Sequence, residues 1–425
     1  MRLRSHSRSI TPTRLLVALT FALVTALLAS APTTAAQSAA AGPAAQEDTD
    51  DRLISRAWPT LVIAYRQQLE DAGIVGSSLL LMHQGRIAGS AHEGFEDIET
   101  RKPIDENTIY HWASVTKTFT GIAVMQLRDR GLLDLDDPVI DYVPELRKVH
   151  NPFGPMEDIT IRHVMSHSAG FRASTWPWGG SEPWHPFEPT RWAQLAAMMP
   201  YTEVQFAPGT EYSYSNPAVI FLGRIIEQLS GDDYEMYVTK NVLMPLGMHR
   251  TFFDRAPPHL LHHRSHSYFL SDAGLEEAAF DFDTGVTVSN GGLNSPFTDM
   301  ALYLDFLLGN PERQDDYDRI LARSSLDEMF APVIRAEDGE GGSGPDVRAA
   351  LSFFVERHQG LQLVGHSGNQ NGFILHLYLD PPTRSGYLVA FNTYVTSEAR
   401  GSDRITQDVD DAIRDLLIER ILSAL

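Results

Sequence analysis

The sequence predicts an α+β fold: an antiparallel sheet built from both chain ends, flanked by helices, with an inserted, mostly helical subdomain over about residues 118–340. Three observations support this prediction. Strand-like alternation of apolar and polar residues occurs at 76–90 and returns at 350–394. Helical spacing, interrupted by loops rich in Pro and Gly, fills most of residues 113–340. Amphipathic helices near both chain ends can cover one face of the sheet.

Local signals define the elements in order. A helical pattern over residues 52–72 ends at Gly73, and a hairpin follows in which Gln84 and Gly85 supply the turn. The predicted strands are Ser78–His83, Arg86–Ser90, Ala350–Arg357, Gln362–His366, Phe373–Leu379 and Tyr387–Tyr394. A final helix over Ile405–Leu425 carries an apolar face that can pack on the sheet.

Composition excludes several classes of protein. The chain has 425 residues, of which 43% are hydrophobic, so it can bury a large core. It carries 34 Lys and Arg against 55 Asp and Glu, a net charge of −21, which argues against nucleic acid or anionic lipid as the main partner. There are no cysteines, so disulfides, Cys-ligated zinc, iron–sulfur clusters and a thiol nucleophile are excluded.

The N-terminus is typical of an export signal. Arg2, Arg4, Arg8 and Arg14 come first. The 17 uncharged residues Leu15–Ala31 follow, and then small residues up to Ala36. We interpret 1–36 as a signal peptide, 37–51 as a flexible lead-in and 52–425 as one domain. A secreted or periplasmic protein is expected. The alternative is an uncleaved membrane anchor, because the stretch has nearly the length of a membrane span.

The strongest chemical signal is Ser114-Val115-Thr116-Lys117. Lys117 is the only charged residue from Ala113 to Leu127, and the helix that follows is apolar enough to be buried. Residues three apart share a helix face, so the Ser114 hydroxyl and the Lys117 amine can meet. A desolvated lysine can give up its proton and act as a base. The alternative is a serine N-cap with a lysine that extends to solvent.

Two further motifs come later in the chain. Tyr214-Ser215-Asn216 follows a loop and precedes a helix; a phenol beside a lysine can shuttle protons as a phenolate, and the Asn216 amide can both donate and accept. The alternative is a buried tyrosine with one hydrogen-bond partner. His366-Ser367-Gly368 ends a strand and leads to Gly372 and a second strand, so its backbone N–H groups can face a substrate.

Other patterns carry less weight. Gly339–Gly344 fits G-x-G-x-x-G, but Pro345 and neighbouring acids oppose a phosphate site. The histidines from His259 to His266 have no H-E-x-x-H context and indicate an exposed loop more than a metal site. Trp176–Trp184 is open to two interpretations, loop packing or a pocket rim.

Together, the three chemical motifs resemble the serine β-lactamase and penicillin-binding-protein superfamily, in the branch of class C β-lactamases, D-alanyl-D-alanine carboxypeptidases and related esterases. The likeness extends over roughly residues 52–425. Further similar segments are His111–Lys117, Leu132–Val139, Ile161–Gly170, Pro245–Met248 and Gly291–Leu293. The resemblance implies the β-lactamase/transpeptidase-like fold, which agrees with the α+β prediction.

The resemblance also implies roles for the site residues. Ser114 is the nucleophile, Lys117 its base and Tyr214 a proton shuttle, while Asn216 binds the substrate amide and orients Lys117. Gly368 and Asn369 follow His366, and the N–H of Asn369 joins that of Ser114 in holding the oxyanion. His366 stands where class C β-lactamases carry a lysine, which weakens the case for an antibiotic-inactivating enzyme. We expect His366 to titrate near neutral pH and His167 to be structural.

The sequence therefore predicts an exported serine hydrolase that forms an acyl-enzyme with an ester, a D-amino-acid peptide or a β-lactam. The substrate is a small molecule or peptide, possibly derived from the cell wall, and no metal or organic cofactor is implied. No nucleic acid partner is expected, and no stable membrane contact if the signal is cleaved. The alternative is a catalytically silent relative that binds cell-wall peptide or glycan. The sequence makes no prediction of oligomeric state.

Overall fold

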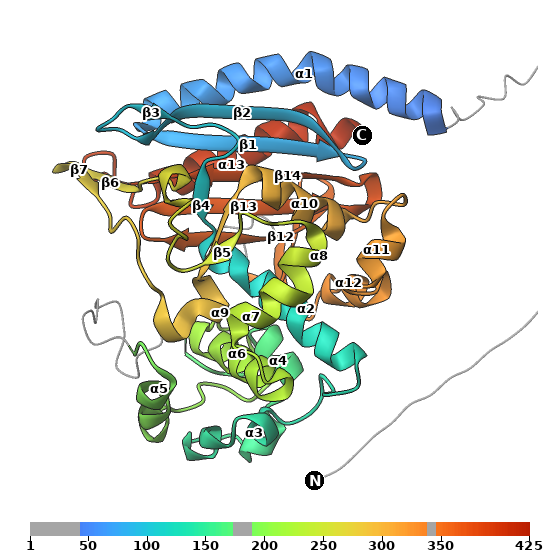
Figure 1. The fold of residues 1–425 in the computed structure, drawn as a ribbon, viewed down its shortest axis with the longest axis vertical. Coiled ribbons are helices and arrows are strands. Elements are labelled where there is room, and N and C mark those ends of the chain that lie inside the picture. Colours follow the sequence, from blue (N-terminus) through green and yellow to red (C-terminus); the bar gives the residue numbers. More distant parts are fainter. Residues whose placement is uncertain (1–42, 173–188, 338–345) are drawn as a thin grey trace, which may run out of the picture. The chain divides into compact units, whose positions relative to one another are not determined.

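The computed structural model describes residues 43–172, 189–337 and 346–425 (Figure 1). The predicted signal peptide, the Trp176–Trp184 stretch and Gly339–Gly344 lie outside the described residues. Within those ranges, no helix combines the length and the apolar character that a membrane span requires.

The main sheet joins both ends of the chain, as predicted. Within the described residues it has nine strands, and every neighbouring pair is antiparallel. In spatial order they are β3 (Lys102–Pro103), β2 (Arg86–Asp97), β1 (Gly76–His83), β14 (Ser385–Phe391), β13 (Phe373–Asp380), β12 (Leu361–Gln370), β11 (Phe354–His358), β10 (Asp346–Ala349) and β9 (Ile334–Glu337). The junction is the β1–β14 pair, in which Leu79 lies opposite Val389.

Helices cover both faces of this sheet (Figure 1). The two terminal helices, α1 (Pro43–Ala72) and α13 (Ile405–Arg420), pack on one face. Their buried side chains include Leu61, Tyr65, Leu69, Val409, Ile413 and Leu417. The other face belongs to a larger core that contains α2 (Thr116–Asp129) and α10 (Phe297–Leu308). The prediction that both terminal helices share one face is confirmed.

The inserted region is mostly helical, and it also contains short strands that the sequence pattern did not predict. Its remaining α-helices are α3 (Val139–Tyr142), α4 (Ile161–Met165), α5 (Trp192–Met198), α6 (Asn216–Ser230), α7 (Tyr234–Val238), α8 (Met244–Leu246), α9 (Val288–Gly291), α11 (Gln314–Asp318) and α12 (Arg323–Met329). One small sheet consists of β4 (Ile109–His111), β8 (Leu293–Pro296) and β5 (Phe252–Phe253). A second one combines β15 (Thr393–Val395) with β6 (Tyr268–Ser271) and β7 (Gly274–Glu277).

Two local predictions are wrong. The flexible lead-in is predicted over 37–51; residues 37–42 lie outside the described residues, and 43–51 form the first turns of α1. Within these turns, buried Asp50 lies 3.5 Å from His83 Nε2, beside the sheet. The predicted strand Ala350–Arg357 is also wrong in its first half. Ser352 has a positive φ of 61° and donates its backbone N–H to Met165 in the helical region, so β10 and β11 are separate strands.

Candidate active site

Ser114 lies in a short 3₁₀ turn, Ala113–Val115, immediately before α2. The N-cap of α2 is Val115, so Ser114 does not cap the helix and its hydroxyl is available for other contacts. Ala113 has a φ of 45°, a conformation that costs energy for a residue with a Cβ and that is often found at functional sites. Strand β12 passes close to this turn, because a Cβ on Gly368 would lie 2.6 Å from the Trp112 carbonyl oxygen.

The Lys117 side chain is 1% exposed and points back to Ser114. Its Nζ lies 3.0 Å from Ser114 Oγ and donates to the Asn290 carbonyl oxygen at 2.8 Å. No carboxylate of the described residues forms an ion pair with it. Burial holds the pKa of Lys117 well below its ordinary value. Burial therefore favours the neutral amine, which is the form that can accept the Ser114 proton.

Tyr214 completes this group from the other side. Its hydroxyl donates to Ser114 Oγ at 2.8 Å, and Lys117 Nζ lies 4.9 Å from the centre of its ring. Burial raises the pKa of Tyr214 above its ordinary value, although the hydrogen bond to Ser114 opposes this. A pKa above the ordinary value keeps the Tyr214 hydroxyl protonated near neutral pH, so the expected phenolate is not the form that burial favours. The role of Tyr214 as a proton shuttle stays a prediction.

The His167 ring packs against the Tyr214 ring. The two ring centres are 4.5 Å apart, and His167 Nδ1 accepts the backbone N–H of Ser215 at 3.1 Å. Burial lowers the pKa of His167 well below its ordinary value, so the ring is neutral. These contacts agree with the structural role expected for this histidine.

Asn216 begins α6, where the Ser215 hydroxyl caps the helix by accepting the Ala218 N–H at 3.2 Å. The predicted contact between Asn216 and Lys117 is not made. The Asn216 Oδ1 atom is buried and has no hydrogen-bond partner among the described residues. The Asn290 carbonyl orients Lys117 instead, and the Asn290 side chain donates to the Asn216 carbonyl at 3.2 Å.

Asn290 is the residue that sequence reasoning missed. It acts through its backbone carbonyl, which any residue type could supply, so its identity carried no signal. The one available clue was its place directly before the segment Gly291–Leu293, which resembles the family.

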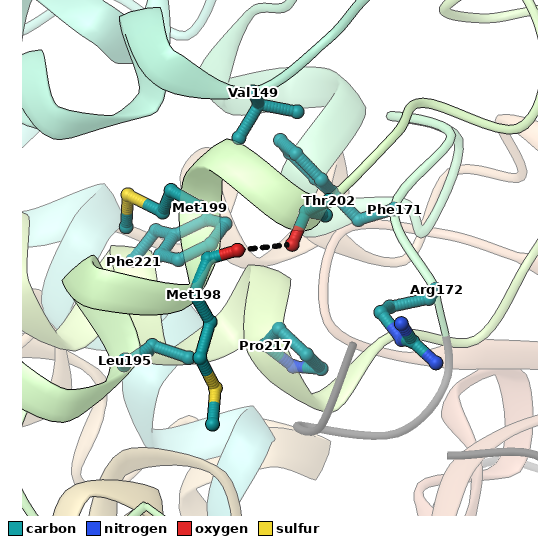
Figure 2. A pocket seen from close by; sticks show the side chains of 9 residues that line it. All are labelled: Val149, Phe171, Arg172, Leu195, Met198, Met199, Thr202, Pro217 and Phe221. Atoms are coloured by element: carbon teal, nitrogen blue, oxygen red, sulfur yellow. Dashed lines mark hydrogen bonds between the residues drawn. The ribbon is translucent and has the colours of Figure 1, made fainter. Parts of the chain in front are cut away.

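Pro217, the residue that follows Asn216, lines a small apolar cavity. Pro217 contributes to it together with Phe171, Phe221 and neighbouring methionines (Figure 2). Its volume is about 20 Å³, which is room for about one water molecule. The cavity is therefore part of the packing under α6 and is too small to hold a substrate.

His366 lies on β12, is 3% exposed and packs against Phe354 with ring centres 5.2 Å apart. Its Nδ1 lies 2.6 Å from the Ser367 carbonyl oxygen, to which it can only donate. Burial is the main cause that lowers the pKa of His366 to about 3, and a positive charge on Lys117 also opposes protonation of the ring. The expectation that this histidine titrates near neutral pH is therefore wrong. Its Nε2 is a buried acceptor without a partner among the described residues.

The register of β12 decides where the Asn369 N–H points. Asn371 and Gly372 have φ values of 51° and 82°, a two-residue turn that makes Gln370 and Phe373 a hydrogen-bonded pair. Because bonded and non-bonded pairs alternate, Asn369 directs its N–H away from β13. On that side β11 stops pairing at Gly365, so the N–H faces an open strand edge. This geometry fits the predicted oxyanion donor, whose role stays a prediction.

Comparison with known proteins places this arrangement in a family. Residues 63–410 match the family described as Beta-lactamase, which is well over half of the chain. The chain belongs to the beta-lactamase family. Solved structures of similar fold include a penicillin-binding protein homologue, a class C beta-lactamase and a D-amino acid amidase. Together with the family match, they confirm the superfamily resemblance and the fold class.

Among its relatives, the chain is 26% identical over 324 residues to Protein flp of Staphylococcus aureus (strain MW2) and covers 61% of that protein's length with 76% of its own. A penicillin-binding protein homologue from Pyrococcus abyssi, described as octameric, is 27% identical with a TM-score of 0.67, covering 79% of this chain and 73% of that one. The D-amino acid amidase from Ochrobactrum anthropi SV3 shares the fold, with 21% identity, a TM-score of 0.67 and coverage of 86% and 99%.

Proposed function

We propose that this member of the beta-lactamase family is an exported serine hydrolase that forms an acyl-enzyme on Ser114 with an ester or amide that lacks a carboxylate. The observation that carries the proposal is the Ser114–Lys117–Tyr214 group, in which the hydroxyl of Ser114 contacts both a buried amine with a lowered pKa and a phenol with a raised pKa. A base and an acid on one nucleophile are what acyl transfer needs.

In the first half of the reaction, Lys117 accepts the proton of Ser114 and Oγ attacks the substrate carbonyl. The N–H groups of Ser114 and Asn369 stabilise the oxyanion. Tyr214 gives its proton to the leaving alcohol or amine, and the Lys117 ammonium returns a proton to Tyr214. In the second half, water loses a proton to Lys117 and attacks the acyl carbon. The acid leaves and Ser114 recovers its proton.

The protonation state of His366 limits which substrates are expected to bind. A lysine at this position would hold a substrate carboxylate, but a histidine kept neutral by burial offers no positive charge. Its Nε2 acceptor suits a substrate N–H or O–H instead. Solved structures of similar fold include a D-stereospecific amidohydrolase and a D-amino acid amidase, so amides and esters of D-amino acids are the first substrates to test.

Covalent labelling tests the proposal. A fluorophosphonate should add one adduct to the wild-type chain in intact-mass spectra, and Ser114→Ala should add none while keeping its melting temperature. Ser230→Ala, at the far end of α6, is the matched control and should label fully. An adduct that persists in Ser114→Ala would falsify the assignment. No adduct in the wild type would favour the silent binding protein.

Export is a separate part of the proposal. The basic, apolar and small-residue segments of 1–36 support a cleaved signal, which would start the mature protein near Gln37. N-terminal sequencing of protein from the producing cells decides this point. Met1 or Arg2 at the N-terminus of a membrane fraction would establish the anchor instead.

A further inference from the structure

A second cavity lies apart from Ser114. It has a volume of about 340 Å³ and is bordered by the start of α5, the middle of α6, the start of α7 and residues 285–289. This volume falls within the usual range of small-molecule sites, about 300–1,000 Å³. None of the residues proposed for catalysis lines the cavity. We call it the α6–α7 groove.

Arg224 gives one part of the groove a positive charge, and its neighbours hold the side chain in place. The Trp192 indole donates to Glu145 at 3.1 Å, and the Arg224 guanidinium lies 5.6 Å from the centre of the Trp192 ring. Arg224 also pairs with Glu227 at 3.0 Å. Its Nε atom is buried and donates to no described atom. The Arg224 side chain as a whole is 35% exposed, so its guanidinium can still donate to a ligand oxygen in the groove.

Another part of the groove is negatively charged. Asp233 and Glu235 lie at the start of α7, and neither forms an ion pair with a described residue. Asp233 precedes the helix but its side chain makes no capping hydrogen bond. Burial raises the pKa of Glu235, and the nearby acids Glu227 and Asp233 raise it further. A cation between these carboxylates would relieve their repulsion.

We propose that the α6–α7 groove binds a small zwitterion, an amino acid or dipeptide, with its carboxylate at Arg224 and its ammonium at Asp233 and Glu235. Only a ligand with both charges satisfies both parts of the lining. A ligand with one charge can contact only one of the two parts. This inference is independent of the proposed hydrolysis, because the groove contains none of the Ser114 machinery.

The groove and the active site share the four-residue helix α9. Ser289 lines the groove and packs closely on α6, since a Cβ on Gly223 would lie 2.5 Å from its Oγ. The next residue, Asn290, holds Lys117 through its carbonyl. A zwitterion in the groove therefore lies against the helix that positions Lys117.

Calorimetric titration of the full chain tests the proposal. Glycylglycine is the probe, with N-acetylglycylglycine lacking the ammonium and glycylglycinamide lacking the carboxylate. We expect each one-charge analogue to bind the wild type about tenfold more weakly or worse, because a hydrogen bond to a charged group is worth about 1.5–3 kcal/mol. Arg224→Gln and Glu235→Gln should each weaken glycylglycine about tenfold. Ser114→Ala should bind it as the wild type does.

The control variant is Arg319→Gln, which removes an exposed ion pair far along the chain and should not change binding. The analogue series uses the wild-type protein, so it decides the question even if a variant fails to fold. No binding of glycylglycine at millimolar concentrations would overturn the proposal. Equal binding of all three probes would also overturn it, and loss of binding in Ser114→Ala would place the ligand in the active site instead.

Discussion

Two histidines on neighbouring strands, His366 and the partly buried His376, differ in charge because they lie on opposite faces of the main sheet. His366 on β12 faces the helical insert and pairs across the sheet with Leu377. His376 on β13 lies opposite Ser367, one position along, and so points to the face covered by α13. Burial lowers the pKa of His366 to about 3. Burial also opposes charge on His376, but the hydrogen-bonded Asp410 carboxylate raises its pKa above the ordinary value.

The comparison shows that a partner, rather than burial, decides whether an interior group is charged. On the α13 face the charges are paired: Arg414 lies 3.2 Å from Glu356, which also accepts the Tyr378 hydroxyl at 2.8 Å. On the Ser114 face, Lys117 has no carboxylate partner among the described residues, and burial holds its pKa well below the ordinary value. An uncharged lysine can accept a proton. The paired charges on the other face connect α13 to the sheet.

The largest effect on activity is expected from substitutions on the Ser114 face of the sheet. Lys117→Ala and Tyr214→Phe should each lower kcat/KM for an ester by about 10²–10⁴-fold, the usual cost of losing an acid or base. The double variant should be barely slower than the worse single one, because both groups serve the same proton transfer. Steady-state kinetics measure this. Fully multiplicative losses would show that the two residues act in different steps.

Removing a charge pair from the face covered by α13 should change the free energy of unfolding and not the catalytic rate. Asp410→Asn removes the counter-charge of His376 and should lower the free energy of unfolding by about 1–3 kcal/mol, the cost of an unsatisfied buried group, with kcat nearly unchanged. Urea denaturation measures the loss. Arg404→Ala is the control on the same side of the molecule, since its pairs with Asp408 and Asp411 are exposed and should contribute less than about 1 kcal/mol.

The two histidines should make opposite contributions to stability as pH changes. The folded pKa of His376 is raised, so its contribution is complete below the unfolded pKa, about 6.5, and is lost as pH rises through the folded value. The folded pKa of His366 is lowered to about 3, so stability falls as pH drops from about 6.5 toward that value.

Each slope is at most about 1.4 kcal/mol per pH unit. Unfolding free energies measured by urea denaturation across pH 4–9 should lose part of their alkaline slope in His376→Gln and part of their acid slope in His366→Gln. If His366→Gln leaves the acid limb unchanged, His366 is not buried as a neutral group.

The smallest expected effect is on substrate preference. Because His366 stays neutral, the ratio of kcat/KM for an anionic ester to that for its neutral analogue should be constant within about twofold across pH 5–9. His366→Lys should raise that ratio by adding a cation. A wild-type ratio that falls as pH passes 6–7 would show that His366 is protonated in the substrate complex.

Much of the fold was predictable from the sequence, because periodicity and turn residues are local signals. The hairpin around Gln84 and Gly85 and the helix that begins at Ile405 follow their sequence patterns closely. Where tertiary contacts competed with the pattern, the prediction failed. Ser352 leaves the sheet to bond Met165, and α1 extends to Pro43 beside contacts made by Asp50.

For the candidate site, the sequence by itself determined the residue types and the Ser114–Lys117 spacing, since three positions along a helix bring two side chains together whatever surrounds them. Protonation was decided only by tertiary structure. Whether Lys117, Tyr214 and His366 carry charge depends on burial and on nearby carboxylates, which come from distant parts of the chain. The same is true of Asn290, whose backbone carbonyl reaches Lys117 only because α9 packs between α2 and α6.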